Sequence, residues 1–249
     1  MQIESHSEFR YHMRSRSALA LEKRYVQSLF DAIANRYDFL NHLLSGGVDV
    51  YWRRRAAERL RGGAMNDVLD VATGTGDFGF AAIRIGARRV VGVDIAEAML
   101  ERGREKIERR KLADRITLTT GEAEKLPFAD TSFDAAIVAF GARNFEHLDL
   151  GIAEMHRVLR DGGKIIVLEF SKPRLFPFKQ VYLFYFRFVL PLIGRYVSGH
   201  AEAYTYLPET VMQFPEGERF LQILRDAGFK AVAEDRLTFG IATIYTGMK

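Results

Sequence analysis

A glycine-rich turn is the part of this sequence whose residue types and spacing most clearly point to chemistry. Residues 70–77 read Asp-Val-Ala-Thr-Gly-Thr-Gly-Asp and separate a short apolar run from an amphipathic stretch. Glycines at such a turn let a ligand approach the backbone where a strand passes into a helix. The next predicted strand ends at Asp94, whose carboxylate can accept hydrogen bonds from both hydroxyls of a ribose. The turn, with Gly74 and Thr75, and Asp94 therefore predict a nucleoside-binding site.

Two classes of nucleoside cofactor compete for this turn. A dinucleotide dehydrogenase would carry Gly-x-Gly-x-x-Gly, with a pyrophosphate at the start of the following helix. Here Ala72 stands at the first glycine position, and Asp77 lies where the helix would meet phosphate. A carboxylate repels pyrophosphate but attracts the ammonium and sulfonium charges of S-adenosylmethionine. We therefore predict S-adenosylmethionine as the cofactor, with Asp77 among its contacts and a nicotinamide dinucleotide as the alternative.

A third segment is expected at the same place. Residues 121–128 follow the predicted strand 116–120. Ligands of open α/β sheets bind outside the carboxyl ends of the strands, so we expect Glu122 and Ala123 to flank the adenine. The alternative is an acidic loop facing solvent.

The elements that must position these segments alternate along the chain. Strands are predicted over 66–71, 89–93, 116–120, 133–140 and 164–169, and helices over 78–85, 96–110, 147–160 and 216–227. Alternation of this kind implies a mostly parallel sheet with helices on both faces. Two closely spaced runs, 229–235 and 237–246, predict an antiparallel hairpin at the sheet edge. We therefore expect a Rossmann-like α/β fold with seven strands.

Length and composition fit one domain. A chain of 249 residues that is 48% hydrophobic and 27% charged can bury a single core. We expect a flexible tail over 1–24 that is no secretory signal, and one domain over 25–249 with an aromatic-rich insertion at 170–214. The lack of cysteine excludes disulfides, thiolate metal sites and cysteine nucleophiles, and six histidines leave little material for a metal cluster. We predict no metal.

Positive charge concentrates in the insertion. Between Phe170 and Ala201 there are five basic residues and no acidic one, whereas the rest of the chain has 31 basic and 32 acidic residues. The aromatic run 176–190 contains Arg187 and is too short to span a bilayer. Its mixture of large apolar and cationic side chains predicts an interfacial helix or a lid over a lipid tail, with a core helix or a dimer contact as the alternative. Residues 52–55, Trp-Arg-Arg-Arg, are interpreted as a solvated helix face rather than a nucleic-acid site.

Several of these segments resemble the ubiquinone/menaquinone-biosynthesis C-methyltransferase family. The matching segments are 37–45 followed by Trp52 (Tyr-Asp-x-Met-Asn signature), the turn 73–77, residues 140–144 (Phe-Gly-x-Arg-Asn), the second signature over 154–171, and residues 204–207 and 238–240. The departures are Leu40 for Met, Asp49 for His, Ala139 for a frequent Ser, and Arg160 with Asp161 for Lys-Pro. No cofactor role is therefore carried over to Ala139.

The resemblance implies a class I S-adenosylmethionine-dependent methyltransferase acting on a ring carbon of a reduced polyprenyl quinone. An aromatic carbon becomes nucleophilic when an adjacent hydroxyl loses its proton, so the site needs a base or donors that stabilise the phenolate. Arg143 can hold the phenolate and Asn144 can orient the hydroxyl, with Tyr37 as a further contact for the quinol oxygen. The alternatives are a structural ion pair between Arg143 and a loop carboxylate, and a core-packing role for Tyr37.

The resemblance leaves the quinol open. Demethylmenaquinol is preferred on the ending at 247–249, and the methoxy-polyprenyl-benzoquinol of ubiquinone synthesis, or both substrates, is the alternative. It further implies a cytoplasmic protein at the inner face of the cytoplasmic membrane, with no nucleic-acid partner and a possible homodimer. A non-enzymatic alternative is a basic protein that binds lipid or nucleic acid in a salt-sensitive way without a cofactor.

Overall fold

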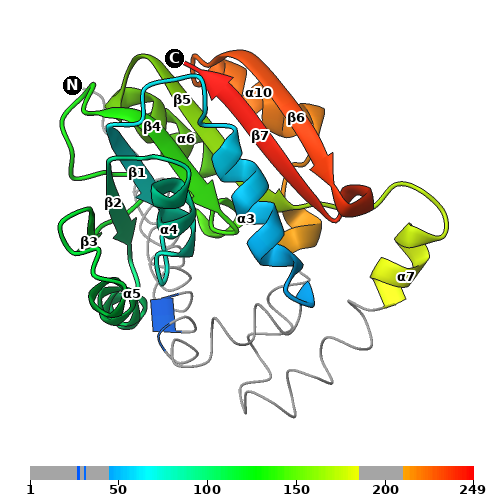
Figure 1. Cartoon of the computed structure of the whole chain (residues 1–249). Coiled ribbons are helices and arrows are strands. Elements are labelled where there is room, and N and C mark those ends of the chain that lie inside the picture. Colours follow the sequence, from blue (N-terminus) through cyan, green and yellow to red (C-terminus); the bar gives the residue numbers. More distant parts are fainter. Residues whose placement is uncertain (1–26, 29–30, 32–44, 185–209) are drawn as a thin grey trace, which may run out of the picture.

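A seven-stranded sheet forms the centre of the computed structural model, which describes residues 27–28, 31, 45–184 and 210–249 (Figure 1). The strands are β1 (Asp67–Val71), β2 (Arg89–Asp94), β3 (Ile116–Thr120), β4 (Phe133–Ala139), β5 (Leu159–Phe170), β6 (Lys230–Leu237) and β7 (Ala242–Met248). Their order is β3-β2-β1-β4-β5-β7-β6, and β7 runs antiparallel to both of its neighbours. The predicted mostly parallel sheet with an antiparallel C-terminal hairpin is confirmed.

Helices cover both faces of the sheet. The helices are α3 (Val48–Glu58), α4 (Asp77–Arg84), α5 (Glu97–Arg109), α6 (Leu148–Val158), α7 (Phe178–Phe184) and α10 (Glu218–Asp226), with short 3-10 turns η1 (Ala142–Asn144) and η3 (Thr238–Gly240). In Figure 1, α3 and α4 lie in front of the sheet, α6 and α10 lie behind it, and α7 stands apart. The expected three-layer α/β arrangement is therefore present.

The central strands are apolar on both sides because both faces are covered. Val68 of β1 packs with the side chains under α3 and α4, whereas its neighbour Leu69 packs with those under α6 and α10. In β4, Ile137 and Val138 divide between the two cores in the same way. This double burial is typical of parallel strands. It also aligns the carboxyl ends of β1, β2 and β4 along one edge of the sheet.

Two predicted boundaries are wrong. Helix α6 ends at Val158 rather than at residue 160, and Leu159 already pairs with Phe133 as the first residue of β5. Leu159 is fully buried, so core packing draws it into the sheet before the glycines that were expected to separate helix from strand. The hairpin turn lies at η3 rather than next to Asp235, because Thr238, Phe239 and Gly240 adopt positive φ there.

The prediction that residues 52–55 form a solvated helix face is correct only in part. The Arg54 side chain is 72% exposed, but that of Arg53 is only 9% exposed because it forms an ion pair with the buried Asp49 on the preceding turn. Asp49 is the residue that replaces the family's usual His, and this structure gives it a structural role. The Trp52 indole N–H donates to Thr238 Oγ1 at 2.8 Å, which ties α3 to the hairpin turn.

Several predictions fall outside the described residues. These are the tail 1–24, Tyr37, and the part of the insertion from 185 to 209. Within the described ranges, no helix combines the length and the apolar character needed to cross a bilayer. Nor do the described residues contain a group of histidine, aspartate or glutamate side chains suited to hold a metal ion.

The contact between α5 and the sheet depends on a glycine. A Cβ atom on Gly103 would lie 2.5 Å from Leu118 Cδ1 and 3.4 Å from the Thr75 backbone. We therefore expect Gly103→Val to lower the free energy of unfolding by about 1–3 kcal/mol, since overpacking forces neighbours apart. Glu101→Val places the same side chain on the exposed face of the same helix and should change it by less than about 0.5 kcal/mol. Urea unfolding measures both, and equal midpoints would contradict this packing argument.

Candidate active site

The glycine turn after β1 is held by a buried carboxylate. Asp70 Oδ2 accepts hydrogen bonds from Thr73 Oγ1 at 2.7 Å and from the Gly79 N–H at 2.9 Å. This joins the end of β1 to the first turn of α4, while Gly74 and Gly76 take positive φ between them. Burial raises the pKa of Asp70 to about 7, because the bonds to Thr73 and Gly79 only partly offset the loss of solvent. The sequence reasoning did not assign this role to Asp70.

Asp94 lies where it was predicted, at the end of β2 beside the turn. Its Oδ2 accepts the Gly74 N–H at 2.8 Å, and its Oδ1 accepts the Ala96 N–H at 2.9 Å at the start of α5. Burial raises the pKa of Asp94, although these backbone bonds act in the opposite direction. Each carboxylate oxygen keeps a second lone pair, so the geometry allows Asp94 to accept ribose hydroxyls as well.

A second carboxylate near Asp94 comes from the amino-terminal part of the chain. Asp31 Oδ1 accepts the Ala98 N–H at 3.2 Å, in the first turn of α5. A negative side chain at this position is favoured by the helix dipole. The sequence offered no signal for this contact, since the two residues are far apart along the chain.

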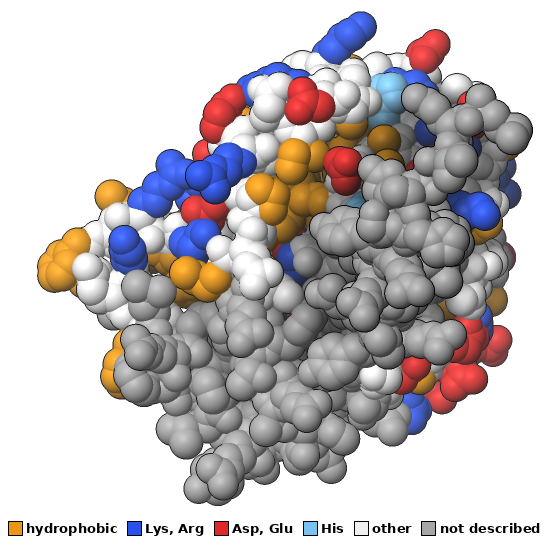
Figure 2. All heavy atoms as spheres, turned by 180° about the vertical axis from the view of Figure 1, so that it is seen from behind, with side chains coloured by type: hydrophobic (Ala, Val, Ile, Leu, Met, Phe, Trp, Pro, Cys, Tyr) orange, Lys and Arg blue, Asp and Glu red, His pale blue; other side chains and the backbone are white. Residues whose placement is uncertain are grey.

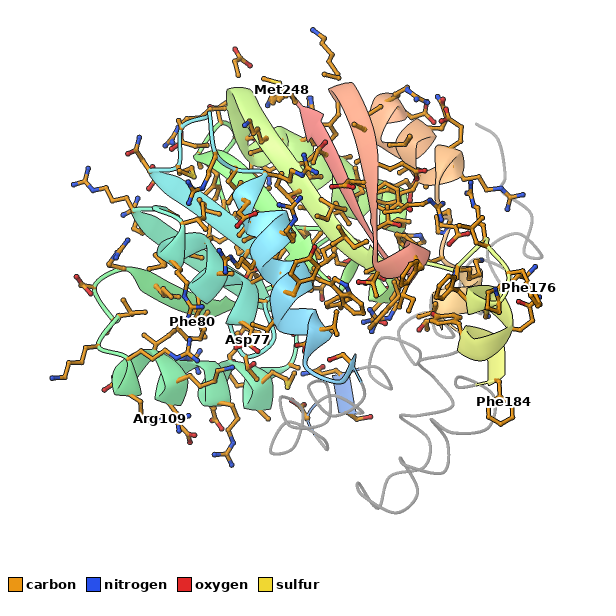
Figure 3. The ribbon with its side chains drawn as sticks, turned by 45° about the vertical axis from the view of Figure 1, so that its right-hand side comes forward. Asp77, Phe80, Arg109, Phe176, Phe184 and Met248 are labelled. Atoms are coloured by element: carbon orange, nitrogen blue, oxygen red, sulfur yellow. The ribbon has the colours of Figure 1, made fainter. Side chains whose placement is uncertain are left out.

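Asp77 lies at the start of α4 as predicted, but its carboxylate has a partner. Lys106 of α5 forms an ion pair with Asp77 at 2.5 Å and also donates to Thr75 Oγ1 at 2.9 Å. Figure 3 shows Asp77 between α4 and α5. The sequence argument treated Asp77 as an unpaired negative charge, whereas Lys106 offsets much of that charge. Asp77 is therefore weaker evidence for a cationic cofactor than expected. Thr75 contacts the same lysine.

The loop after β3 is adjacent to Asp94. The Gly121 N–H donates to the Asp94 carbonyl at 3.0 Å, and Glu122 forms an isolated bridge with Lys125. Ala123 is buried and belongs to the same apolar core as Leu126. The predicted adenine-flanking residues Glu122 and Ala123 therefore follow directly on a residue bonded to Asp94.

Arg143 and Asn144 lie in η1, directly after β4. A Cβ atom on Gly141 would lie 2.5 Å from Ala72 Cβ, so the end of β4 packs against the glycine turn. Arg143 Nη1 donates to the Phe140 carbonyl at 2.5 Å and to Glu169 Oε1 at 2.8 Å. The ion pair that was the alternative interpretation of Arg143 is present, but its partner belongs to strand β5 rather than to a loop.

Eight predicted site residues gather at the carboxyl edge of the sheet. They are Gly74, Thr75, Asp77, Asp94, Glu122, Ala123, Arg143 and Asn144. The donor set fits a nucleoside with a charged tail: carboxylate acceptors suit a ribose, a buried apolar face suits adenine, and an acid with a lysine partner suits an amino-acid group. Tyr37, the remaining candidate, lies outside the described residues.

The strand order, the antiparallel β7 and the nucleoside-type turn after β1 define a class I methyltransferase fold. Within that class, the chain belongs to the ubiE/COQ5 methyltransferase family, whose sequence profile matches residues 18–249. The predicted family and enzyme class are thereby confirmed.

Two curated relatives illustrate the similarity. A demethylmenaquinone methyltransferase of Bacteroides fragilis is 44% identical over 90% of this chain and 92% of its own length. The ubiquinone/menaquinone biosynthesis C-methyltransferase UbiE of Geotalea uraniireducens is 47% identical over 90% of this chain and 96% of its own. The family match over residues 18–249 includes both the glycine turn after β1 and the C-terminal hairpin.

Solved structures resemble the fold at much lower identity. A Thermotoga maritima SAM-dependent methyltransferase aligns with a TM-score of 0.62 and 19% identity, over 89% of this chain and 99% of its own. The [4+2]-cyclase SpnF aligns with a TM-score of 0.65 and 18% identity, over 90% and 94% of the two chains. A cyclase on this fold shows that the architecture alone does not fix the reaction.

The position of Asp94 predicts a specific loss of cofactor binding. We expect Asp94→Ala to raise the dissociation constant of S-adenosylhomocysteine about tenfold or more, because a hydrogen bond to a charged group contributes about 1.5–3 kcal/mol. Asp114→Ala removes one exposed carboxylate elsewhere and should bind normally. Calorimetric titration of both variants, with circular dichroism as a check on folding, measures the difference. Unchanged binding by a folded Asp94→Ala variant would refute the ribose assignment.

Proposed function

We propose that this enzyme transfers a methyl group from S-adenosylmethionine to a ring carbon of demethylmenaquinol and so forms menaquinol. The observation that carries this proposal is the packing of Gly141 against Ala72, which fixes Arg143 beside the cofactor turn. The name of the Bacteroides relative supports the naphthoquinol. The name of the Geotalea relative keeps the methoxy-polyprenyl-benzoquinol, or both quinols, as the alternative.

The residues at the edge have distinct tasks in this reaction. S-adenosylmethionine, when bound, supplies an electrophilic methyl group on a sulfonium. The Arg143 guanidinium stabilises the quinolate oxygen with its positive charge, while Asn144 orients the hydroxyl. Phe140 and Phe170 have ring centroids 4.5 Å apart, and Trp52 packs on both at 6.1 Å. This apolar cluster keeps water away from the Arg143 side chain and so strengthens its interaction with a quinolate.

The deciding experiment supplies labelled S-adenosylmethionine with chemically reduced demethylmenaquinone or methoxy-polyprenyl-benzoquinone. We expect label in menaquinol, and Arg143→Ala should lower kcat by about 10²-fold or more without a matching change in cofactor affinity, since the guanidinium acts on the transition-state charge. The exposed Arg54→Ala variant is the control. Label only in the benzoquinol would show that the benzoquinol is the substrate, and label in neither quinol would overturn the proposed function.

An exposed apolar and basic surface supports contact with a membrane. We call it the α7 patch, and its members are Lys172, Arg174, Leu175, Phe176, Phe178, Lys179, Phe184, Met212 and Phe239. Phe176 is 80% exposed, and Figure 3 shows Phe176 and Phe184 pointing away from the sheet. In Figure 2, hydrophobic side chains project at the left, where α7 lies, with Lys and Arg side chains next to them.

The backbone at η3 keeps one member of the α7 patch exposed. Thr238 and Phe239 both have positive φ, a conformation that is uncommon for residues with a side chain. The hydrogen bond from Trp52 to Thr238 stabilises this turn. Phe239 is 60% exposed there, and its ring stacks on Phe178 of α7 with centroids 3.9 Å apart. The strained turn thus joins η3 and α7 into one apolar surface.

We propose that the α7 patch binds the inner face of the cytoplasmic membrane, where the cytoplasmic enzyme meets its lipid-soluble quinol. Aromatic side chains next to lysine and arginine suit the boundary between acyl chains and anionic headgroups. The substrate's polyprenyl tail stays in lipid while the ring reaches Arg143. A homodimer stays a prediction.

The α7 patch predicts membrane binding that depends on its exposed aromatic side chains. We expect the double variant Phe176→Ser with Phe239→Ser to lose most co-sedimentation with vesicles that contain anionic lipid, because each change removes a large apolar side chain from the interface. Leu150→Ser changes an exposed apolar residue of α6, 49% exposed, and should bind as the unchanged protein does. Equal binding by all three proteins would contradict the membrane-facing assignment.

A further inference from the structure

Glu169 is a buried carboxylate that the reaction described so far does not use. It is the next-to-last residue of β5, at the same edge of the sheet as the cofactor turn, and its side chain has no exposed area. Its Oε1 accepts Arg143 Nη1 at 2.8 Å. Its Oε2 has no hydrogen-bond partner among the residues that the structure describes. Such an oxygen is costly to bury, so its retention calls for an explanation.

Arg143 also has a buried polar atom without a hydrogen-bond partner in the described ranges. Its Nε is buried and, within the described part of the chain, also lacks a hydrogen-bond partner. An unfilled donor and an unfilled acceptor therefore belong to two side chains that are already joined by one ion pair. A hydroxyl group placed between the two atoms can bond to both, because it accepts a hydrogen bond through oxygen and donates one through its proton. A neighbouring carboxylate or ammonium could satisfy only one of them.

The charged and titratable groups around Glu169 come from several elements. Arg143 faces it from η1. The buried Tyr182 faces it from α7, and its hydroxyl also interacts electrostatically with Glu216. On the α3 side, Arg53 lies over the Phe140 ring and is paired with Asp49. On β7, the residue opposite Glu169 is Thr243, whose hydroxyl is bonded to Ser171. Arg143 is thus the cation that directly balances this carboxylate.

These surroundings place the titration of Glu169 near neutrality. Burial raises its pKa to about 7, because the attraction of Arg143 offsets only part of the desolvation. A proton acceptor works best when its pKa lies near the operating pH. Burial also raises the pKa of the Tyr182 hydroxyl, so Tyr182 stays neutral in the same range.

We propose that Glu169 is the proton acceptor for the quinol hydroxyl, an inference that rests on the proposed function. The hydroxyl accepts from Arg143 Nε and donates to Glu169 Oε2. The O–H bond breaks, its electron pair stays on the quinol oxygen, and the proton binds Oε2. Arg143 then pairs with the quinolate in place of the carboxylate, so the site holds one cation and one anion before and after the step. S-adenosylmethionine would then supply its methyl group to the ring carbon, with the carbon–sulfur electron pair left on sulfur. Loss of the proton from that ring carbon restores the aromatic ring, and Glu169 returns its proton to the quinol oxygen.

The test compares Glu169→Gln with the unchanged protein in the labelled-methyl assay from pH 5.5 to 9.5. We expect kcat/KM of the unchanged protein to fall about tenfold per pH unit below about 7, because protonated Glu169 cannot accept a second proton. At pH 8, Glu169→Gln should have a kcat/KM lower by about 10²-fold or more, and its pH profile should lack the fall below about 7. The variant should stay folded by circular dichroism and keep its affinity for S-adenosylhomocysteine. Glu218→Gln neutralises an exposed carboxylate paired with Arg225 on α10 and is the control.

Chemical rescue separates proton acceptance from a structural role. A quinol made more acidic by a halogen substituent ionises without a base, so it should restore much of the activity of Glu169→Gln and little of that of Arg143→Ala. Glu169 is not the proton acceptor if the kcat/KM of Glu169→Gln still falls below about pH 7, or if the acidic quinol rescues neither variant. In either case, methyl transfer by the unchanged protein still establishes the function. A folded protein that methylates no quinol overturns the function itself.

Discussion

The bonds that Asp70 and Asp94 make to backbone N–H groups are the constraint on which the rest of the site depends. Asp70 ties the end of β1 to the Gly79 N–H, and Asp94 ties the end of β2 to the Gly74 N–H. Without these acceptors, backbone donors in a turn shaped by positive φ would be buried without partners. Because both carboxyl groups are buried in this arrangement, desolvation also raises the pKa of each. The same two acids therefore build the turn and set the electrostatics of the cofactor edge.

Architecture explains where the chemistry takes place, and individual side chains explain which chemistry it is. Parallel strands covered on both faces bring the ends of β1, β2 and β4 to one edge, and a cyclase shares this arrangement. At that edge, this chain has the buried pair of Arg143 and Glu169. A guanidinium beside a carboxylate that titrates near neutrality suits a substrate that must lose a hydroxyl proton, whereas it offers nothing specific to a substrate without one.

The sequence predicted the sheet, the turn and Asp94 because local patterns determine them: alternating elements, glycines after an apolar run, and an acid at a strand end. It could not predict partners that are distant along the chain. Lys106 neutralises Asp77 from the next helix, and Glu169 pairs with Arg143 from the next strand. Each of these pairs depends on the twist of the sheet and on helix placement, for which a residue pattern gives no signal. Leu159 was misplaced for a related reason, since its burial in the sheet outweighed the stop signal of the glycines that follow.

Trp52 links the α7 patch to the Arg143–Glu169 pair. Its indole N–H holds Thr238, the residue before the exposed Phe239, and its ring packs on Phe140 and Phe170. Phe140 also supplies the carbonyl that Arg143 bonds, and Phe170 directly follows Glu169. The surface proposed to face lipid is therefore connected to the side chains proposed to bind the quinol ring through Trp52 and the two phenylalanine rings. A quinol anchored in a bilayer by an apolar tail can expose its ring only a short way, so a reaction centre close to the membrane-facing surface reduces the cost of drawing the tail into water.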